Sequence, residues 1–357
     1  MLAADIYQRI DNAARKCAGE HAEMQGSLAG LWKRLEGING QADIGYRLEQ
    51  AAHYIGAVPT AEPPGSSFPP VSQTLPCIGV DGSQVYPDER SPVLWAYIQA
   101  VAFRQGSTSH PLLFRFWGDQ AAPLPEHSAV WLDAERTLLE LETACQAAQK
   151  WSDHLILLDN PLMSWFDFFR DASFLERYLA LLKSCSPRYI AGVVSSPRST
   201  LLADLIRLAD CPHPADWKRR ADEVNDTALV RRGIPVGFRS ALFRYAPGRN
   251  RAYQQAEAGV YFFFVRVTTS EVVRVEIPEW LAQFNSTVQL IHASVLADSR
   301  MLGYSYALTQ AHRQAAVTQD VAEALRRRAE RVFLSETQKA LPPSGKQVVK
   351  ALAAQNG

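Results

Sequence analysis

This sequence has no excess of positive or negative charge. Its 357 residues include 37 lysines and arginines against 37 aspartates and glutamates, so the formal net charge is zero. This balance excludes a histone-like protein or a supercharged binder of polyanions. It leaves room for a local basic groove, because net charge does not describe how charges are distributed. The 47% of hydrophobic residues is typical of a globular protein with a sizeable core, in one large or two ordinary domains.

Long apolar runs are also missing, which bears on membranes and export. The longest run covers residues 260–265 and is far too short to cross a bilayer. Asp5 comes early in an N-terminus that has no continuous apolar segment, which is unlike a secretory signal. We therefore expect a protein without a membrane anchor.

Cysteine pairs and several common catalytic motifs are absent as well. The five cysteines are odd in number and scattered without CxxC spacing, so we expect no structural zinc and a reducing cytoplasm as the simplest compartment. The P-loop, GxGxxG, HExxH and GxSxG patterns do not occur. Their absence disfavours a P-loop hydrolase, a dinucleotide enzyme, a zincin and an ordinary α/β-hydrolase.

The composition divides the chain into four segments. Residues 1–57 are predicted to be helical, since apolar residues recur there at three- and four-residue spacing. Residues 58–75 hold five prolines and are predicted to be a linker or an extended crossing segment, because proline disfavours both helix and sheet pairing. The main domain covers residues 76–335, and residues 336–357 are predicted to be a flexible tail.

Strand and helix patterns alternate along the main domain. Strand patterns cover residues 77–83, 93–103, 111–116, 154–159 and 189–195, with a hairpin over 260–277. Helical patterns cover residues 132–150, 174–183, 199–208 and 288–333, with a break near Gly303. This order predicts an α/β fold with one mixed sheet flanked by helices.

Two aspartates follow apolar strands. Asp81 comes after the 78–80 strand and Asp159 after the 155–158 strand. Functional sites in α/β sheets collect at the carboxyl ends of strands, so neighbouring strands would place both carboxylates side by side. Adjacent carboxylates repel unless a cation neutralises them, and their hard oxygens suit magnesium or manganese. Each aspartate alone is more simply a turn cap; the matching pair favours a metal site.

Further candidates lie on helices. Only one of Glu140 and Glu142 can face the site, because two residues of separation turn a helix by about 160°. Glu140 is preferred, since it lies one turn from Arg136. Tyr304 and His312 project within about 80° of each other from the helix after Gly303. A lone histidine or tyrosine on a helix is more often a packing or surface residue.

Several segments in this order resemble the NurA family of DNA-repair nucleases. Residues 78–83 resemble its first motif, residues 157–162 its second and residues 191–198 its third. Residues 239–243, 274–278 and 303–312 also resemble family segments. The departures are Asn160-Pro161 in place of Gly-Ser, Ser305 in place of proline, and Arg198 where many members carry lysine. The resemblance covers roughly residues 76–320.

The resemblance implies a ribonuclease H-like sheet with helical additions at both ends, and a nuclease that uses manganese, with magnesium as the alternative. It implies that Asp81, Glu140 and Asp159 hold one or two metal ions. His312 would complete the metal site or shuttle a proton, and Tyr304 would position water or phosphate.

The same resemblance implies how DNA and partners bind. Arg198 and Arg239 would contact phosphates, and the basic stretch 218–251 would belong to the DNA-binding surface unless it is only a solvated loop. The family implies a homodimer that works with a HerA-type hexameric ATPase. The implied reactions are single-strand endonuclease and 5′-to-3′ exonuclease cleavage, in end resection and double-strand-break repair.

Two other interpretations remain open from the sequence. An inactive family member could serve as a DNA-binding or ATPase-docking subunit, which the Asn160-Pro161 change allows and the intact aspartate pair disfavours. An α/β phosphatase or a sugar-kinase-like fold would also place acids after apolar strands, but it would require a phosphate-binding glycine turn that the sequence does not contain.

Overall fold

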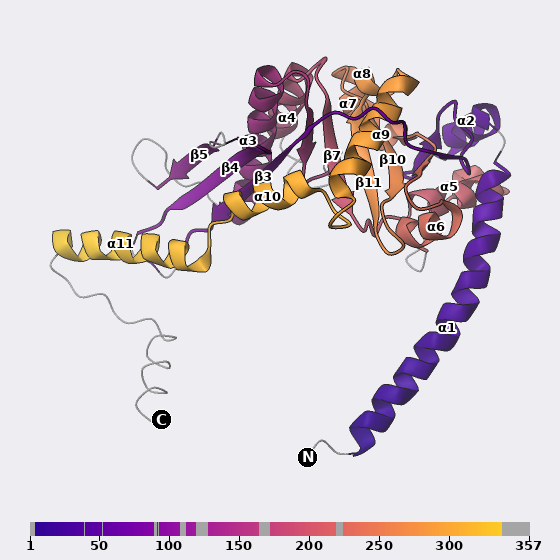
Figure 1. Cartoon of the computed structure of the whole chain (residues 1–357), viewed down its shortest axis with the longest axis horizontal. Helices are drawn as coiled ribbons and strands as arrows, with labels where there is room; N and C mark the ends of the chain where they lie inside the picture. Colours follow the sequence, from indigo (N-terminus) through magenta and orange to yellow (C-terminus); the bar gives the residue numbers. More distant parts are fainter. Residues whose placement is uncertain are drawn as a thin grey trace.

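The computed structural model describes residues 4–38, 40–51, 53–88, 91, 93–107, 112–118, 128–163, 172–218 and 224–337. Apart from its first two residues, the predicted tail 336–357 lies outside this set. An eleven-stranded mixed sheet forms the centre, in the order β1-β9-β10-β11-β7-β6-β3-β4-β5, with β8 pairing with β10 and β2 with β8 (Figure 1). The predicted α/β class is therefore confirmed.

Three parallel strands occupy the middle of this sheet. They are β3 (Cys77–Val85), β6 (Leu155–Leu158) and β7 (Ile190–Ser195). All four residues of β6 are buried, as expected for a strand covered on both faces. Val80 pairs with Leu158, and Leu158 pairs with Gly192, so the three carboxyl ends reach the same edge. This register places Asp81 beside Asp159.

Antiparallel strands extend the sheet on both sides. On one side are β4 (Ala96–Arg104) and β5 (Leu112–Trp117), and on the other the predicted hairpin of β10 (Val260–Arg266) and β11 (Val272–Pro278). The short strands β8 (Arg239–Ser240) and β9 (Phe243–Tyr245) pair with β10. Together with helices α6 (Asp226–Gly233) and α7 (Pro247–Gln255), they give much of the basic stretch 218–251 a regular structure that the sequence did not predict.

Helices cover the two faces of the sheet and define two cores. One face carries α3 (Ser128–Lys150), α4 (Ala172–Ser184), α5 (Leu201–Asp210) and α6 (Asp226–Gly233). The other carries α8 (Glu279–Ala282), α9 (Asn285–Ser299) and α10 (Tyr306–Ala315). Side chains alternate between the two faces of β6 and so contribute to both cores. Ile156 and Leu158 pack in the first core, and Leu155 and Leu157 pack in the second. Further helices in the described ranges include α7 (Pro247–Gln255), α11 (Gln319–Thr337) and a short 3₁₀ helix (Pro214–Asp216).

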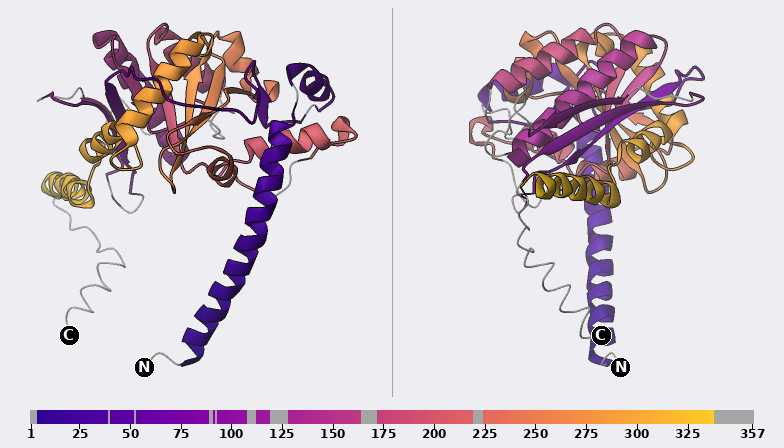
Figure 2. Two further views of the ribbon diagram at one scale, coloured as in Figure 1. Left: turned by 45° about the vertical axis from the view of Figure 1, so that its right-hand side comes forward. Right: turned by 90° about the vertical axis from the view of Figure 1, so that its left-hand side faces the viewer.

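The N-terminal region is helical, as predicted, until residue 50. Helix α1 (Ala4–Glu36) packs only its C-terminal part on the body, through Leu28 and Leu35, and its N-terminal part projects away from the body (Figures 1 and 2). Helix α2 is Gly40–Gln50.

The proline-rich segment 58–75 is more than a linker. Residue 57 begins β1 (Ala57–Pro59), which pairs with β9, and β2 (Ser67–Phe68) pairs with β8. Proline was expected to prevent sheet pairing. These pairs form at the margin of the sheet, where a strand tolerates a residue that donates no ladder hydrogen bond.

The cysteines and the helices test two further expectations. Cys145 of α3 and Cys185, just after α4, form a disulfide that the scattered spacing did not predict. They are 40 residues apart, and the packing of α3 against α4 brings them together. Cys77 and Cys211 are free thiols.

None of the helices in the described ranges is long and apolar enough to cross a membrane.

Candidate metal centre

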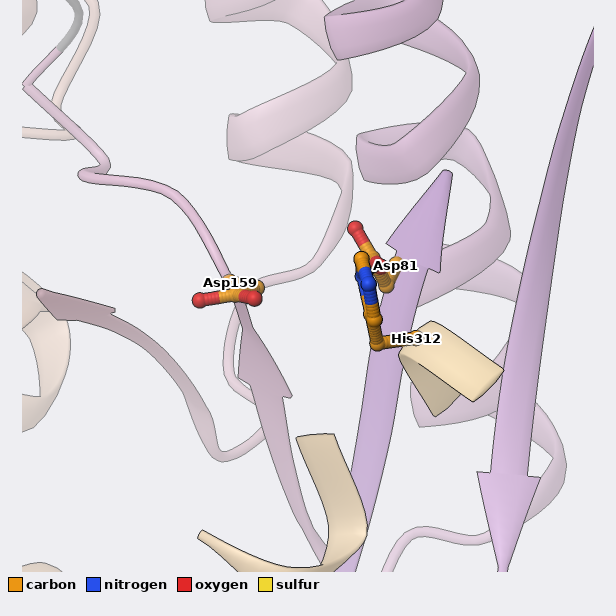
Figure 3. A group of neighbouring side chains, drawn as sticks. All are labelled: Asp81, Asp159 and His312. Atoms are coloured by element: carbon orange, nitrogen blue, oxygen red, sulfur yellow. Dashed lines mark hydrogen bonds and ion pairs between the residues drawn. The ribbon is translucent and has the colours of Figure 1, made fainter. Parts of the chain in front are cut away.

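Asp81, Asp159 and His312 converge at the carboxyl edge of the parallel strands (Figure 3). Asp81 lies within β3 and is 5% exposed, while Asp159 directly follows β6 and is half-buried. Ligand atoms of the three side chains lie within 4.8 Å of one another. The strand pattern predicted that the two aspartates lie together and the family resemblance added His312, and in the structure all three side chains meet at one point.

Helix α10 carries His312 close to β3 because β3 has a glycine beneath the helix. A Cβ atom on Gly79 would lie 2.2 Å from the carbonyl oxygen of Ala307, so no larger residue fits there. The Nδ1 atom of His312 lies 2.7 Å from Oδ2 of Asp81. The His312 side chain is 69% exposed, so its ring is accessible from solvent.

Tyr304 holds Asp159 from the other side of the cluster. Its hydroxyl donates a hydrogen bond to Oδ1 of Asp159. Burial, followed by the nearby charge of Asp159, raises the pKa of Tyr304, so the phenol remains a hydrogen-bond donor. Gly303 allows the preceding turn, with φ of +72°, and Ser305 caps α10 by accepting from the Leu308 N–H. Ser305 thus has a structural role where the family carries proline.

The cluster is electrostatically unfavourable for two ionised carboxylates. Burial raises the pKa of Asp159, and the charge of Asp81 raises it further, although the Tyr304 hydrogen bond acts in the opposite direction. A bound cation would remove this repulsion. The arrangement therefore has the electrostatic character of a cation site.

Glu140 lies next to this cluster but is not one of its three members. It projects from α3, is 1% exposed and packs directly on Gly82. Its Oε2 accepts a hydrogen bond of 2.6 Å from the Asn160 amide, and its Oε1 lies 3.2 Å from the Arg136 guanidinium. Burial raises the pKa of Glu140 to about 7.

Glu142 faces away from this region. Its carboxylate pairs with Arg115 of β5 at 2.7 Å. The two glutamates thus point in different directions, as their spacing predicts, and Glu140 is the one beside the cluster.

Asn160 is the neighbour that sequence reasoning missed. It entered the sequence analysis only as a departure from the second motif, although a polar side chain directly after a strand-end aspartate was a usable signal. Its amide links the loop after β6 to Glu140. Oε1 of Glu140 is buried and accepts no hydrogen bond from the described residues, because the Arg136 contact lacks hydrogen-bond geometry. A buried acceptor without a donor beside two carboxylates fits a cation-binding region.

The two predicted phosphate contacts differ in their surroundings. Arg198 is exposed in the turn after β7, where a ligand can reach it. Arg239 is 0% exposed, pairs with Glu62 at 2.7 Å and stacks over the Phe68 ring. A guanidinium that is buried and paired in this way is not available to DNA, so Arg239 is corrected to a structural residue.

Comparisons with known proteins agree with this arrangement. A family model described as the NurA domain matches residues 76–317. No curated protein sequence matches the chain. The crystal structure of the NurA nuclease from Sulfolobus solfataricus is similar with a TM-score of 0.53 at 13% identity, covering 96% of this chain and 100% of that one. A crystal structure of NurA with manganese has a TM-score of 0.46 at 12% identity, covering 90% and 100%. The similarity to the Sulfolobus structure confirms the predicted fold, a mixed sheet flanked by helices.

Proposed function

This chain belongs to the NurA family, and we propose that it is a manganese-dependent deoxyribonuclease that hydrolyses phosphodiester bonds. The family match covers residues 76–317, which include all three residues of the candidate metal centre. The convergence of Asp81, Asp159 and His312 at the carboxyl edge of the sheet is the observation that carries the proposal. Membership of this family also favours a nuclease over the phosphatase and sugar-kinase alternatives.

The residues of the centre fit manganese, with magnesium as the alternative. Two carboxylates and one imidazole are a hard donor set with one nitrogen ligand, which suits manganese. When bound, such a cation lowers the pKa of a coordinated water and neutralises charge on the reacting phosphate. Asp81, Asp159 and His312 would hold it, and Glu140 would join them as the third acid.

The chain's own side chains support this reaction by holding and delivering groups. Tyr304 fixes the orientation of Asp159 through its hydrogen bond. Asp81 does the same for the His312 ring, which would either complete the metal site or, from its exposed side, shuttle a proton. Glu140 would have to exchange its Asn160 contact for the cation.

We further propose single-strand endonuclease and 5′-to-3′ exonuclease activities in end resection and double-strand-break repair. The partners would be DNA, a HerA-type hexameric ATPase and a second copy of this chain, and the compartment would be the cytoplasm. Exposed apolar side chains on α1 and α11 support contacts with protein partners; they include Ile6, Ile10, Val321, Leu325 and Val332. The exposed Arg198 supports a DNA contact.

One observation favours an inactive subunit as the second candidate. The Asn160 amide holds Glu140, which is buried and ion-paired with Arg136 rather than placed in the cluster. If this contact cannot open, the site would have two acids instead of three. Such a protein would bind DNA or the ATPase without cutting.

A cleavage assay separates the two candidates. Labelled single- and double-stranded DNA is incubated with manganese and the full-length protein, its Asp81→Ala and Asp159→Ala variants, and Asp153→Ala as a matched control. Asp153 is exposed and precedes β6, whereas Asp159 follows it. We expect both site variants to lose cleavage with unchanged circular dichroism, and the control to cut normally. Cleavage by either site variant at the normal rate contradicts the metal centre, and no cleavage by the wild type favours the inactive subunit.

A further inference from the structure

A cavity of about 390 Å³ opens at the carboxyl end of β7, away from the metal centre. Three arginines from three separate elements line it: Arg198 from the turn after β7, Arg249 from α7 and Arg274 from β11. Among the described residues that line it, the single acid is Asp204. Arg274 is ion-paired with Glu276, so Arg198 and Arg249 are the guanidinium groups that a ligand in the cavity would meet, and they favour an anionic ligand.

Arg274 forms the fixed part of this cavity. The residue is 5% exposed, its Nε donates to Glu276 at 2.9 Å, and its Nη1 donates to the Ser199 hydroxyl at 2.9 Å. These two contacts hold the guanidinium plane in one orientation. The ion pair with Glu276 balances the charge of Arg274, so this residue shapes the cavity wall and leaves the binding of a charged ligand to Arg198 and Arg249.

The turn that carries Arg198 is also held in place. Ser196 has φ of +41°, and its N–H donates to the Val272 carbonyl at 2.9 Å, which ties the turn to β11. Arg198 itself is exposed and, within the described part of the chain, forms no hydrogen bond or ion pair. Non-glycine residues in the left-handed region are uncommon and cluster at ligand-binding sites.

Strand register relates the cavity to the metal centre. Leu158, which precedes Asp159, pairs with Gly192, and Val194 in the cavity wall lies two residues further along β7. Asp159 therefore lies level with Val193, and one strand spacing across and one residue along give a separation of about 6 Å between the backbones of Asp159 and Val194. The cavity lies on the face covered by α5, so a bound strand would cross the sheet edge between the two sites.

We propose that this three-arginine cavity binds a phosphate group of the nucleic acid strand that is cut at the metal centre. The location rests on the proposed nuclease function, while the anion-binding chemistry rests on the arginines alone. The oxygens of a phosphate match the fork of a guanidinium, which binds two of them at once. The phosphate belongs either to the strand interior or to its 5′ end, since both present the same oxygens.

Binding measurements on the full-length protein test the proposal. Arg249→Gln, Arg198→Gln and the double variant are compared with Arg188→Gln, an exposed arginine just before β7 and thus at the opposite end of that strand. Affinity for single-stranded oligonucleotides, with and without a 5′-phosphate, is measured against salt in calcium by fluorescence anisotropy. Circular dichroism verifies the fold of each variant.

We expect either cavity variant to lower affinity about tenfold, as for the loss of a charged hydrogen bond. The salt slope should fall by about 0.7 for each lost phosphate contact on a single strand. An equal loss for both oligonucleotides identifies an internal phosphate, and a loss confined to the phosphorylated one identifies the 5′ end. Unchanged affinity, or an equal loss with Arg188→Gln, overturns the proposal. A loss of binding in a protein that proves unable to cleave DNA would support the cavity while rejecting the nuclease function.

Discussion

Two aspartate–histidine pairs, with similar distances between their side chains, lie at opposite ends of the parallel strands. Asp153 and His154 are adjacent in sequence just before β6, and their side chains meet at 2.8 Å. Asp81 and His312 are 231 residues apart and meet at 2.7 Å at the carboxyl edge. In the first pair the aspartate side chain is 80% exposed and the histidine 11% exposed; in the second the values are 6% and 69%.

The exposed partner is the aspartate in the first pair and the histidine in the second, and this difference explains why only the second pair resembles an active site. The hydrogen bond from His154 lowers the pKa of Asp153. The contact between these two side chains is an ordinary surface contact. At the other end, burial and a second carboxylate raise the pKa of Asp159 beside Asp81. Buried acids in need of a cation, with an accessible imidazole above them, provide the elements of metal-assisted hydrolysis. The distance between partners does not distinguish the pairs, whereas their surroundings do.

The largest expected effect comes from substituting the histidine of each pair in turn. His312→Gln should lower manganese-dependent cleavage about a thousandfold, because it removes a group that would serve either as a metal ligand or as a proton carrier. His154→Gln should leave the cleavage rate unchanged, since its pair lies at the amino end of β6. Initial rates on single-stranded DNA provide the measurement. Equal rates for the two variants would remove the distinction between the pairs.

A third histidine, His292, extends the comparison, because it is buried and its ring contacts a backbone carbonyl instead of a carboxylate. Burial, and then the charge of Arg239, lowers the pKa of His292 from 6.5 to about 4. The depressed pKa means that this group stabilises the fold above pH 6.5 and loses that contribution as the pH falls towards 4. The loss amounts to about 3 kcal/mol.

The prediction for His292 concerns a difference between two proteins. The stability advantage of the wild type over His292→Gln should shrink between pH 6.5 and 4, when both are unfolded in urea at a series of pH values. The glutamine amide can keep the hydrogen bond to the Gly237 carbonyl. A difference that is constant across this range would mean that His292 does not become protonated there.

The next effect concerns the two glutamates of α3. Glu140→Gln should reduce manganese affinity about tenfold, since groups beside a metal site typically affect binding to that degree. Glu142→Gln should leave it unchanged, because Glu142 pairs with Arg115 away from the centre. Isothermal titration with manganese measures both. The reverse order would show that the helix is rotated relative to the structure when the metal binds.

The sequence predicted the strands that build the site better than the contacts around it. Asp81 and Asp159 were placed together because each follows an apolar run, a pattern that depends only on local sequence, although β3 continues past Asp81 to Val85. The burial of Arg239 was not predictable, since its partner Glu62 is 177 residues away in a segment expected to be a linker. The Asn160–Glu140 bond likewise depends on the packing of α3 over Gly82. Long-range packing therefore decides which polar residues act and which are structural.

The smallest effect addresses the contact that separates Glu140 from the cluster. Asn160→Gly removes the amide that holds Oε2 of Glu140 at 2.6 Å, so the carboxylate can turn towards Asp81 and Asp159. Loss of one hydrogen bond, worth about 1 kcal/mol, should raise manganese affinity about fivefold. Isothermal titration measures this change, and the same substitution in a Glu140→Gln background provides the control, where no gain is expected. A gain that persists in that background would place the effect in the backbone of the loop after β6. A fall in affinity would instead make Asn160 a contributor to the cation site.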